Sequence, residues 1–158
     1  MKKIFDVIIS ILIVLALGAV SGVAARGAGS LYESIERPFF APPASVFGIV
    51  WAILYVMLGI IFYRLFFYWP EVSDTEESRT ASNYFVVQLA INLLWTPIFF
   101  LLHKFWIAFL WIILLIGVAG VTFIRIRRFD KFSWRLSLPY MIWIIFAAIL
   151  NFFIAFMN

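Results

Sequence analysis

Four side chains with helical spacing in the middle of this sequence could recognise a ligand. Gln88, Asn92, Trp95 and Phe99 recur at i, i+4, i+7 and i+11, so two amides and two aromatic rings would share one helix face. An amide in so apolar a segment is costly unless it finds a hydrogen-bond partner. The stripe therefore predicts either a ligand-binding face or hydrogen bonds that hold helices together.

A second stripe lies near the C-terminus. Trp143, Ala147, Leu150 and Asn151 fall at i, i+4, i+7 and i+8, with an aromatic ring at one end and an amide at the other. The small Ala147 would leave space beside Trp143. We expect the amides of Asn92 and Asn151 to pair across a helix bundle.

A third aromatic face follows a segment rich in proline. Trp51, Tyr55 and Leu58 share a helix face, and the segment before them is extended or turned because proline fixes φ and removes backbone donors. The prolines of this segment are Pro38, Pro42 and Pro43. A stiff lid over an aromatic helix would suit a ligand entrance, and the alternative is an ordinary interfacial loop above an aromatic belt.

Acid–base and nucleophilic catalysis have no visible apparatus in this sequence. The apolar segments carry no Asp, Glu, Lys or His near their centres, and nucleophile-elbow, P-loop and dinucleotide motifs are absent. The chain lacks cysteine, and its one histidine, His103, stands beside Lys104, so we predict neither a metal site nor a cofactor.

The chemistry that remains is an apolar pocket for a large, flat, hydrophobic ligand. Its predicted walls are the aromatic residues Trp51, Trp95, Phe99 and Trp143. Its predicted polar groups are Tyr32, Gln88 and Asn92. The alternative is that these aromatic stripes are simply the packed core of a bundle.

Composition identifies the setting as a membrane. Apolar residues make up 66% of the 158 residues, charged residues only 13%, and the mean hydropathy is +1.09. Apolar runs of spanning length predict one all-α transmembrane domain over residues 1–158, a bundle of five helices at about 7–25, 46–67, 84–102, 106–124 and 138–157. The first run could instead be a cleavable secretory signal, but Gly18 and Gly22 are spaced for close helix packing.

The basic residues indicate an orientation. Most of them fall on one side of the predicted spans, including those of two expected loops, 70–80 and 125–135. The positive-inside rule then predicts a multi-pass protein of a bacterial cell membrane with a cytoplasmic N-terminus. In the loop 125–135, aromatic and basic residues alternate, which favours membrane lipid as a partner over nucleic acid.

Three blocks of this sequence resemble the TspO/MBR family, the tryptophan-rich sensory and translocator proteins. The first block is 32–59, with Arg-Pro-x-x-x-Pro-Pro and Val-Trp-x-x-Leu-Tyr; the others are 88–100, with Asn-Leu-Leu-Trp-Thr-Pro, and 139–151, with Pro-Tyr-Met-Ile-Trp. Two tryptophans usual in the first loop of the family are replaced here by Leu31 and Phe40.

The resemblance implies a five-helix protein, commonly a homodimer, that binds porphyrins and other tetrapyrroles, sterols or benzodiazepine-like drugs beneath the first loop. Trp51 and Trp143 match the two tryptophans that flank the ligand in the family. Other matching pocket positions are Tyr32, Pro42, Pro43, Gln88, Asn92, Trp95 and Ala147. The resemblance allows transport or stress signalling, and its alternatives are light- and oxygen-dependent porphyrin degradation using Trp51 and Trp143, or a regulatory membrane partner.

Overall fold

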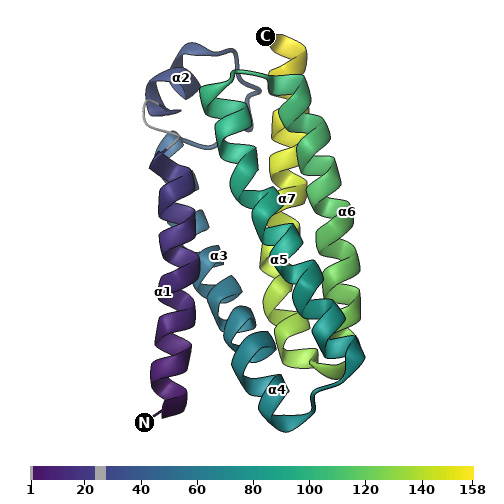
Figure 1. Cartoon of the computed structure of the whole chain (residues 1–158). Helices are drawn as coiled ribbons and strands as arrows, with labels where there is room; N and C mark the ends of the chain where they lie inside the picture. The colour runs from purple at the N-terminus through teal and green to yellow at the C-terminus, as the bar shows by residue number, and fades with distance from the viewer. Residues whose placement is uncertain (1, 24–27) are drawn as a thin grey trace.

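A computed structural model describes residues 2–23 and 28–158, and within these residues it is helical, without strands. Five helical segments are long and apolar enough to cross a membrane, which confirms the predicted five-helix bundle. They are α1 (Lys2–Val23), α3 (Ala44–Tyr63) continuing to Val72, α5 (Glu76–Thr96) continuing to Leu101, α6 (Phe105–Phe129) and α7 (Lys131–Met157). The N-terminus and the C-terminus lie at opposite ends of the bundle (Figure 1).

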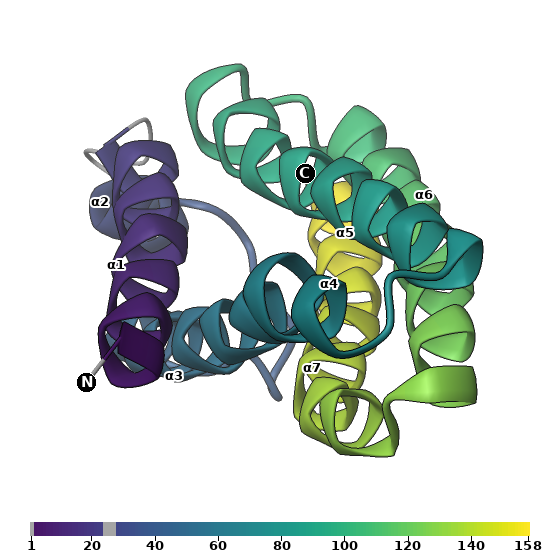
Figure 2. The same ribbon diagram turned by 60° about the horizontal axis from the view of Figure 1, so that its bottom comes forward.

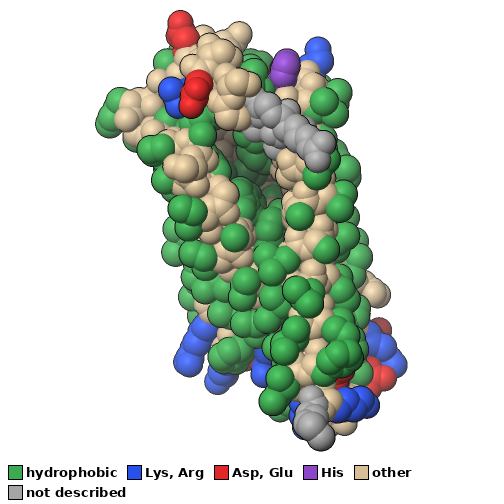
Figure 3. All heavy atoms as spheres, turned by 90° about the vertical axis from the view of Figure 1, so that its left-hand side faces the viewer, with side chains coloured by type: hydrophobic (Ala, Val, Ile, Leu, Met, Phe, Trp, Pro, Cys, Tyr) green, Lys and Arg blue, Asp and Glu red, His purple; other side chains and the backbone are tan. Residues whose placement is uncertain are grey.

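The short helix α2 (Ala28–Ser34) distinguishes the two ends of the bundle. It lies at the end where α7 finishes, and we call this the α2 end (Figure 1). The opposite end holds the start of α1 and the junction at Asp130 between α6 and α7, and we call it the Asp130 end. On the face shown in Figure 3, most Lys and Arg side chains lie at the Asp130 end.

The helices are longer than the apolar runs that predicted them. The first begins at Lys2, and its predicted last residues, 24 and 25, lie outside the described part of the chain. The predicted loops 70–80 and 125–135 are wrong over most of their length: only 73–75 and Asp130 interrupt the helices there. Hydropathy marks only the part of a helix that crosses lipid, whereas charged residues such as Lys, Arg and Glu also form helix readily.

Two glycines bring α1 and α3 into close contact in the middle of the bundle, whereas at the Asp130 end the continuation of α3 lies away from the start of α1 (Figure 2). A Cβ atom added to Gly59 would lie 2.6 Å from the Ile11 Cα atom, and one added to Gly18 would overlap the Tyr55 ring. A Cβ atom on Gly22 would meet nothing within 4 Å. Of the two glycines spaced for packing, Gly18 and Gly22, only the first is used in this way.

Pro97 changes the geometry of α5 and creates a link to α1. The α-helix ends at Thr96 and continues as a π-helical turn, Pro97–Leu101. Proline has no amide hydrogen, so the carbonyl of Leu93, four residues earlier, lacks its usual helical donor. The Ser21 hydroxyl donates to this carbonyl at 2.6 Å. Because Pro97 leaves the Leu93 carbonyl without its helical donor, this carbonyl can accept the hydrogen bond that attaches the last turn of α1 to α5.

A dense polar cluster lies at the Asp130 end. The buried Asp130 carboxylate accepts from Arg64 through both oxygens, at 2.6 and 3.0 Å, from the Trp69 indole at 2.9 Å and from the Ser133 hydroxyl at 2.6 Å. The Ser133 amide also donates to it, so the carboxylate caps α7. Burial alone would raise the pKa of Asp130, but the hydrogen bonds from Arg64, Ser133 and Trp69 outweigh it and hold the pKa below its ordinary value.

Candidate functional site

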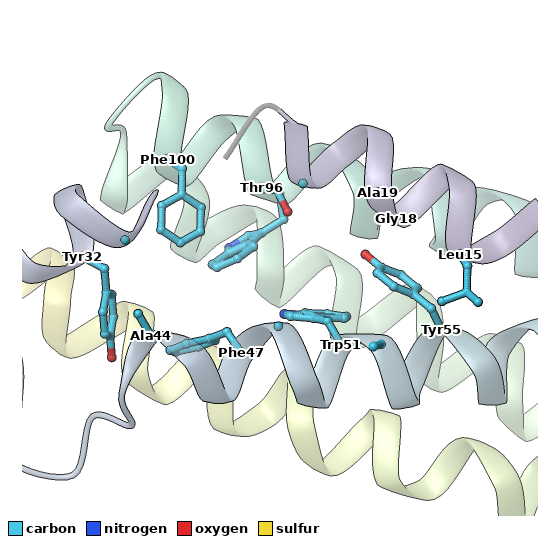
Figure 4. A pocket seen from close by; sticks show the side chains of 15 residues that line it. Leu15, Gly18, Ala19, Tyr32, Ala44, Phe47, Trp51, Tyr55, Thr96 and Phe100 are labelled. Carbon is cyan, nitrogen blue, oxygen red and sulfur yellow. The ribbon is translucent and has the colours of Figure 1, made fainter. Parts of the chain in front are cut away.

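The α2 end contains a cavity of about 450 Å³ between α1, α3 and α5 (Figure 4). Its volume lies within the range of pockets that hold drug-sized ligands. Its lining is almost entirely apolar. The lining residues are Leu15, Gly18, Ala19, Gly22, Gly29, Tyr32, Ala44, Phe47, Gly48, Trp51, Ala52, Tyr55, Trp95, Thr96 and Phe100. We call this space the large cavity.

The large cavity opens on the side of the bundle. The surface is hollowed between the halves of α1 and α3 that lie toward the α2 end (Figure 3). Small residues border this hollow, and a Cβ atom on either Gly22 or Gly48 would meet nothing within 4 Å. Because the flank of a membrane bundle faces lipid, an apolar molecule dissolved in the bilayer could reach the large cavity from the side.

Aromatic rings from α3 form one wall of the large cavity. Phe47, Trp51 and Tyr55 are spaced four residues apart, so their rings follow one another along the helix (Figure 4). The Trp51 and Tyr55 rings are stacked, with centroids 5.4 Å apart and planes 28° apart. The third residue of the predicted stripe, Leu58, is fully buried and lies outside this wall. Phe47 takes its place, one turn before Trp51.

Side chains from α5 and its π-helical turn form another part of the lining. Trp95, Thr96 and Phe100 line the large cavity. Thr96 and Phe100 lie across it from the rings of α3 (Figure 4). The Trp95 ring stacks on Phe99 at 5.1 Å, and the Trp95 indole donates to the Asn151 side-chain oxygen at 3.1 Å. The stacking on Phe99 and the hydrogen bond to Asn151 hold Trp95 in place. The Trp95 side chain also lines the large cavity, where a ligand could contact it.

The two amides predicted as ligand contacts lie in a buried network between helices. Tyr55 donates to Asn92 at 3.1 Å, Asn92 donates to Tyr140 at 3.2 Å, and Tyr140 donates to Gln88 at 2.9 Å. Neither Gln88 nor Asn92 lines the large cavity, and Tyr55 is the member of the network that does. These contacts support the structural alternative for both amides, because the network joins α3, α5 and α7.

The predicted pairing of Asn92 with Asn151 is wrong. The Asn92 amide bonds to the tyrosines of its network, whereas Asn151 accepts from Trp95 and donates to the Phe105 carbonyl at 3.0 Å. Two phenol groups satisfy Asn92, and an indole group and a backbone carbonyl satisfy Asn151. Spacing along the sequence correctly placed both residues inside the bundle but could not identify their partners.

The segment predicted as a lid is fixed to α2 through Tyr32. Tyr32 lines the large cavity, is buried, and donates to the Pro42 carbonyl at 3.0 Å. The Arg37 guanidinium lies 4.7 Å from the centroid of the Tyr32 ring. Pro42 therefore contributes a backbone acceptor, while Pro43 lines a separate surface depression with Arg37 and Pro38.

The remaining predicted residues lie behind the large cavity. Trp143 is not part of its lining; the Trp143 ring packs against Phe47, with centroids 5.8 Å apart. Phe99 and Ala147 line a small neighbouring cavity of about 20 Å³. Of the ten residues predicted for the site, Tyr32, Trp51 and Trp95 line the large cavity.

Sequence reasoning missed the contribution of α1. Leu15, Gly18, Ala19 and Gly22 all line the large cavity and recur at i, i+3, i+4 and i+7. This spacing puts three small residues and one leucine on a single face. The signal was present in the sequence, but small residues in a membrane helix ordinarily indicate helix packing.

Comparisons with known proteins identify the family of this chain. The model of the TspO/MBR family matches residues 10–157. The tryptophan-rich protein TspO of Archaeoglobus fulgidus is 38% identical over 157 residues, 99% of each chain. The protein CrtK of Rhodobacter capsulatus is 32% identical over 78% of this chain and 76% of its own length, and the human translocator protein is 31% identical over 77% and 70%. The chain is therefore an integral, multi-pass membrane protein that belongs to the TspO/MBR family.

Proposed function

We propose that this protein binds a tetrapyrrole such as protoporphyrin, or a similar flat apolar molecule, in the large cavity. The observation that carries the proposal is the aromatic wall of α3, where Trp51 stacks on Tyr55 inside a cavity of about 450 Å³. Stacking on a flat conjugated ligand suits such rings, and apolar walls favour its transfer from water. The family resemblance described for the sequence supports a tetrapyrrole as the ligand.

The opening between α1 and α3 supports the same proposal. A porphyrin dissolves in lipid more readily than in water, and the hollow lies on the flank of the bundle (Figure 3). The relatives include a sensory protein and a translocator protein by name, so ligand binding could serve sensing or transport.

The test compares two tryptophan variants of the purified protein in detergent. Trp51→Leu removes a ring from the wall of the large cavity, whereas Trp106→Leu removes an exposed ring on α6 that does not line it. Protoporphyrin is titrated in the dark and binding is followed by its absorbance. We expect the Kd to rise about tenfold for Trp51→Leu, which corresponds to about 1.4 kcal/mol of lost ring contact.

The control variant Trp106→Leu and an unaffected Trp51→Leu variant have different consequences for the proposal. Trp106→Leu should leave the Kd within about twofold of the parent value, since a surface substitution away from the site changes little. An unchanged Kd in a folded Trp51→Leu variant would show that the porphyrin binds elsewhere. No saturable binding to the parent protein would overturn the tetrapyrrole proposal.

We also propose that the Asp130 end faces the cytoplasm, so the large cavity lies in the outer half of the membrane. Basic residues of the α6–α7 junction and of the N-terminus gather at this end, as the positive-inside rule requires. The chain has no cysteine, so single cysteines at Lys2 and at Asn158 can be labelled with a membrane-impermeant maleimide in intact cells. Labelling of Asn158→Cys alone supports this orientation, and labelling of Lys2→Cys alone contradicts it.

A further inference from the structure

Arg125, near the end of α6, differs from other arginines at the Asp130 end in having no anionic partner. Three arginines at this end form ion pairs with nitrogen–oxygen distances between 2.6 and 3.1 Å. The pairs are Arg64–Asp130, Arg79–Asp74 and Arg128–Glu77. Arg125 forms no such pair with any residue of 2–23 or 28–158. Its positive charge is therefore not neutralised within the described chain.

Part of the Arg125 side chain is also shielded from water. The residue is half-buried, and its Nε atom is buried without a hydrogen-bond partner in the described part of the chain. The guanidinium carbon lies 5.2 Å from the centroid of the Tyr84 ring, a favourable contact that supplies no oxygen acceptor. A buried donor without an acceptor is unfavourable, so an anion with oxygen acceptors would be favoured at this place.

The surroundings of Arg125 change from polar to apolar along the surface shared by α5 and α6. These two helices run antiparallel and lie side by side (Figure 1, Figure 2). Toward the middle of the bundle, Val87 follows Tyr84 on the same face of α5, and Val121 precedes Arg125 on the same face of α6. The side chains of Val87 and Val121 are exposed, as expected for residues that face lipid. A cation and a phenol thus lie above an apolar surface.

We propose that Arg125 and Tyr84 bind the head group of an anionic phospholipid in the leaflet at the Asp130 end. The phosphate oxygens accept hydrogen bonds from the Arg125 guanidinium and the Tyr84 hydroxyl, and the acyl chains lie along Val87 and Val121. A zwitterionic head group carries its own ammonium charge, which offsets the attraction to Arg125, so an anionic lipid is preferred.

This site is distinct from the surfaces described above. It lies on the flank formed by α5 and α6, whereas the alternating basic and aromatic residues of the sequence indicated lipid at the junction between α6 and α7. Neither Arg125 nor Tyr84 lines the large cavity. The inference therefore does not depend on the ligand proposed for that cavity.

The experiment counts lipids bound to the purified protein by native mass spectrometry from detergent that contains phosphatidylglycerol or phosphatidylcholine. Arg125→Gln removes the unpaired charge, and we expect the Kd for the first phosphatidylglycerol to rise about fivefold. Arg79→Gln is the matched control, because it removes an exposed arginine at the same end that is already paired with Asp74. Its Kd should stay within about twofold of the parent value.

A second variant tests the site without changing any charge. Tyr84→Phe keeps the ring beside Arg125 and removes only the hydroxyl, so the fold should be retained and the Kd for phosphatidylglycerol should rise about threefold. Inorganic phosphate added in excess should not displace the lipid, because the acyl chains contribute to binding. Displacement by phosphate would show a site for a free anion and overturn the lipid as its occupant.

The remaining outcomes are equally decisive for this site. In the parent protein, phosphatidylglycerol should bind more tightly than phosphatidylcholine, and Arg125→Gln should remove most of this preference. Equal weakening by Arg125→Gln and Arg79→Gln would show a general effect of charge and overturn the specific site. Unchanged binding of phosphatidylglycerol to folded Arg125→Gln and Tyr84→Phe would also overturn it.

Discussion

The two ends of this bundle are built in opposite ways. At the Asp130 end, one buried carboxylate accepts hydrogen bonds from Arg64, Trp69 and Ser133. In the middle of the bundle, α1 lies in backbone contact with α3 at Gly59. At the α2 end, α1 and α3 border a hollow, and Gly22 and Gly48 have open space beside them. The same pair of helices is closely packed in the middle of the bundle and separated by a hollow toward the α2 end.

This difference explains how a small membrane bundle can hold a cavity. Empty apolar space lowers stability, because the residues around it lose contacts. The polar cluster at the Asp130 end and the glycine contact in the middle of the bundle fix the relative positions of α1, α3, α6 and α7 without help from a ligand. We therefore expect substitutions at these two places to change stability and substitutions at the α2 end to change binding.

The largest expected effect follows the loss of the Asp130 charge. Asp130→Asn keeps the size of the side chain and a capping oxygen but leaves the Arg64 guanidinium without its anion, at a cost of roughly 3 kcal/mol. The free energy of unfolding can be measured in mixed micelles with increasing SDS. Asp74→Asn is the matched control, because the Asp74–Arg79 ion pair is exposed and worth little. Equal effects of the two substitutions would contradict a stabilising cluster.

The stabilisation that the Asp130–Arg64 pair gives the folded protein decreases as the pH falls. The pKa of Asp130 lies below its ordinary value of 3.8 in the folded state, so the unfolded chain takes up the proton first as the pH falls. The stabilisation by Asp130 is therefore complete above about pH 5 and is lost as the pH falls through the lowered pKa. The difference in unfolding free energy between the parent protein and Asp130→Asn, followed from pH 7 to 3, should shrink only below about pH 5. A difference that already shrinks above pH 5 would contradict the lowered pKa.

Two glycine substitutions compare the two halves of the α1–α3 interface. Gly59→Ala puts a methyl group against the Ile11 backbone and should destabilise the protein by about 1–3 kcal/mol. Gly22→Ala puts the same group into open space and should change the unfolding free energy by less than about 1 kcal/mol. Both are measured in the same mixed-micelle assay. Similar losses at the two positions would remove the proposed difference between the middle of this interface and the α2 end.

The smallest expected effect concerns the link between α1 and α5. Ser21→Ala removes the donor to the Leu93 carbonyl that Pro97 leaves without a helical partner. Hydrogen bonds between membrane helices contribute about 0.6 kcal/mol on average, so the loss should be of this order. Hydrogen exchange should show faster opening of the last turn of α1 with the remainder of the bundle unchanged. Faster exchange throughout the bundle would indicate that Ser21 has a wider structural role.

The fold could be predicted because apolar runs of spanning length leave few alternatives in lipid. The site was predicted less completely. Trp51 and Trp95 were found from helical spacing, but spacing alone cannot show that Phe47 separates Trp143 from the large cavity. Nor could charge counting show that Arg64 binds Asp130, since the two residues are 66 positions apart in the chain. Contacts between distant helices depend on packing that no local pattern contains.

One matched pair of substitutions tests whether the ligand binds in the large cavity at the α2 end. Gly48→Leu fills the cavity from α3, whereas Gly117→Leu adds the same side chain to α6 outside it; at both glycines an added Cβ would meet nothing within 4 Å. The measurement is the Kd for protoporphyrin of each folded variant. We expect Gly48→Leu to weaken binding at least about tenfold and Gly117→Leu to leave it unchanged. Unchanged binding by Gly48→Leu would show that the ligand binds outside the large cavity.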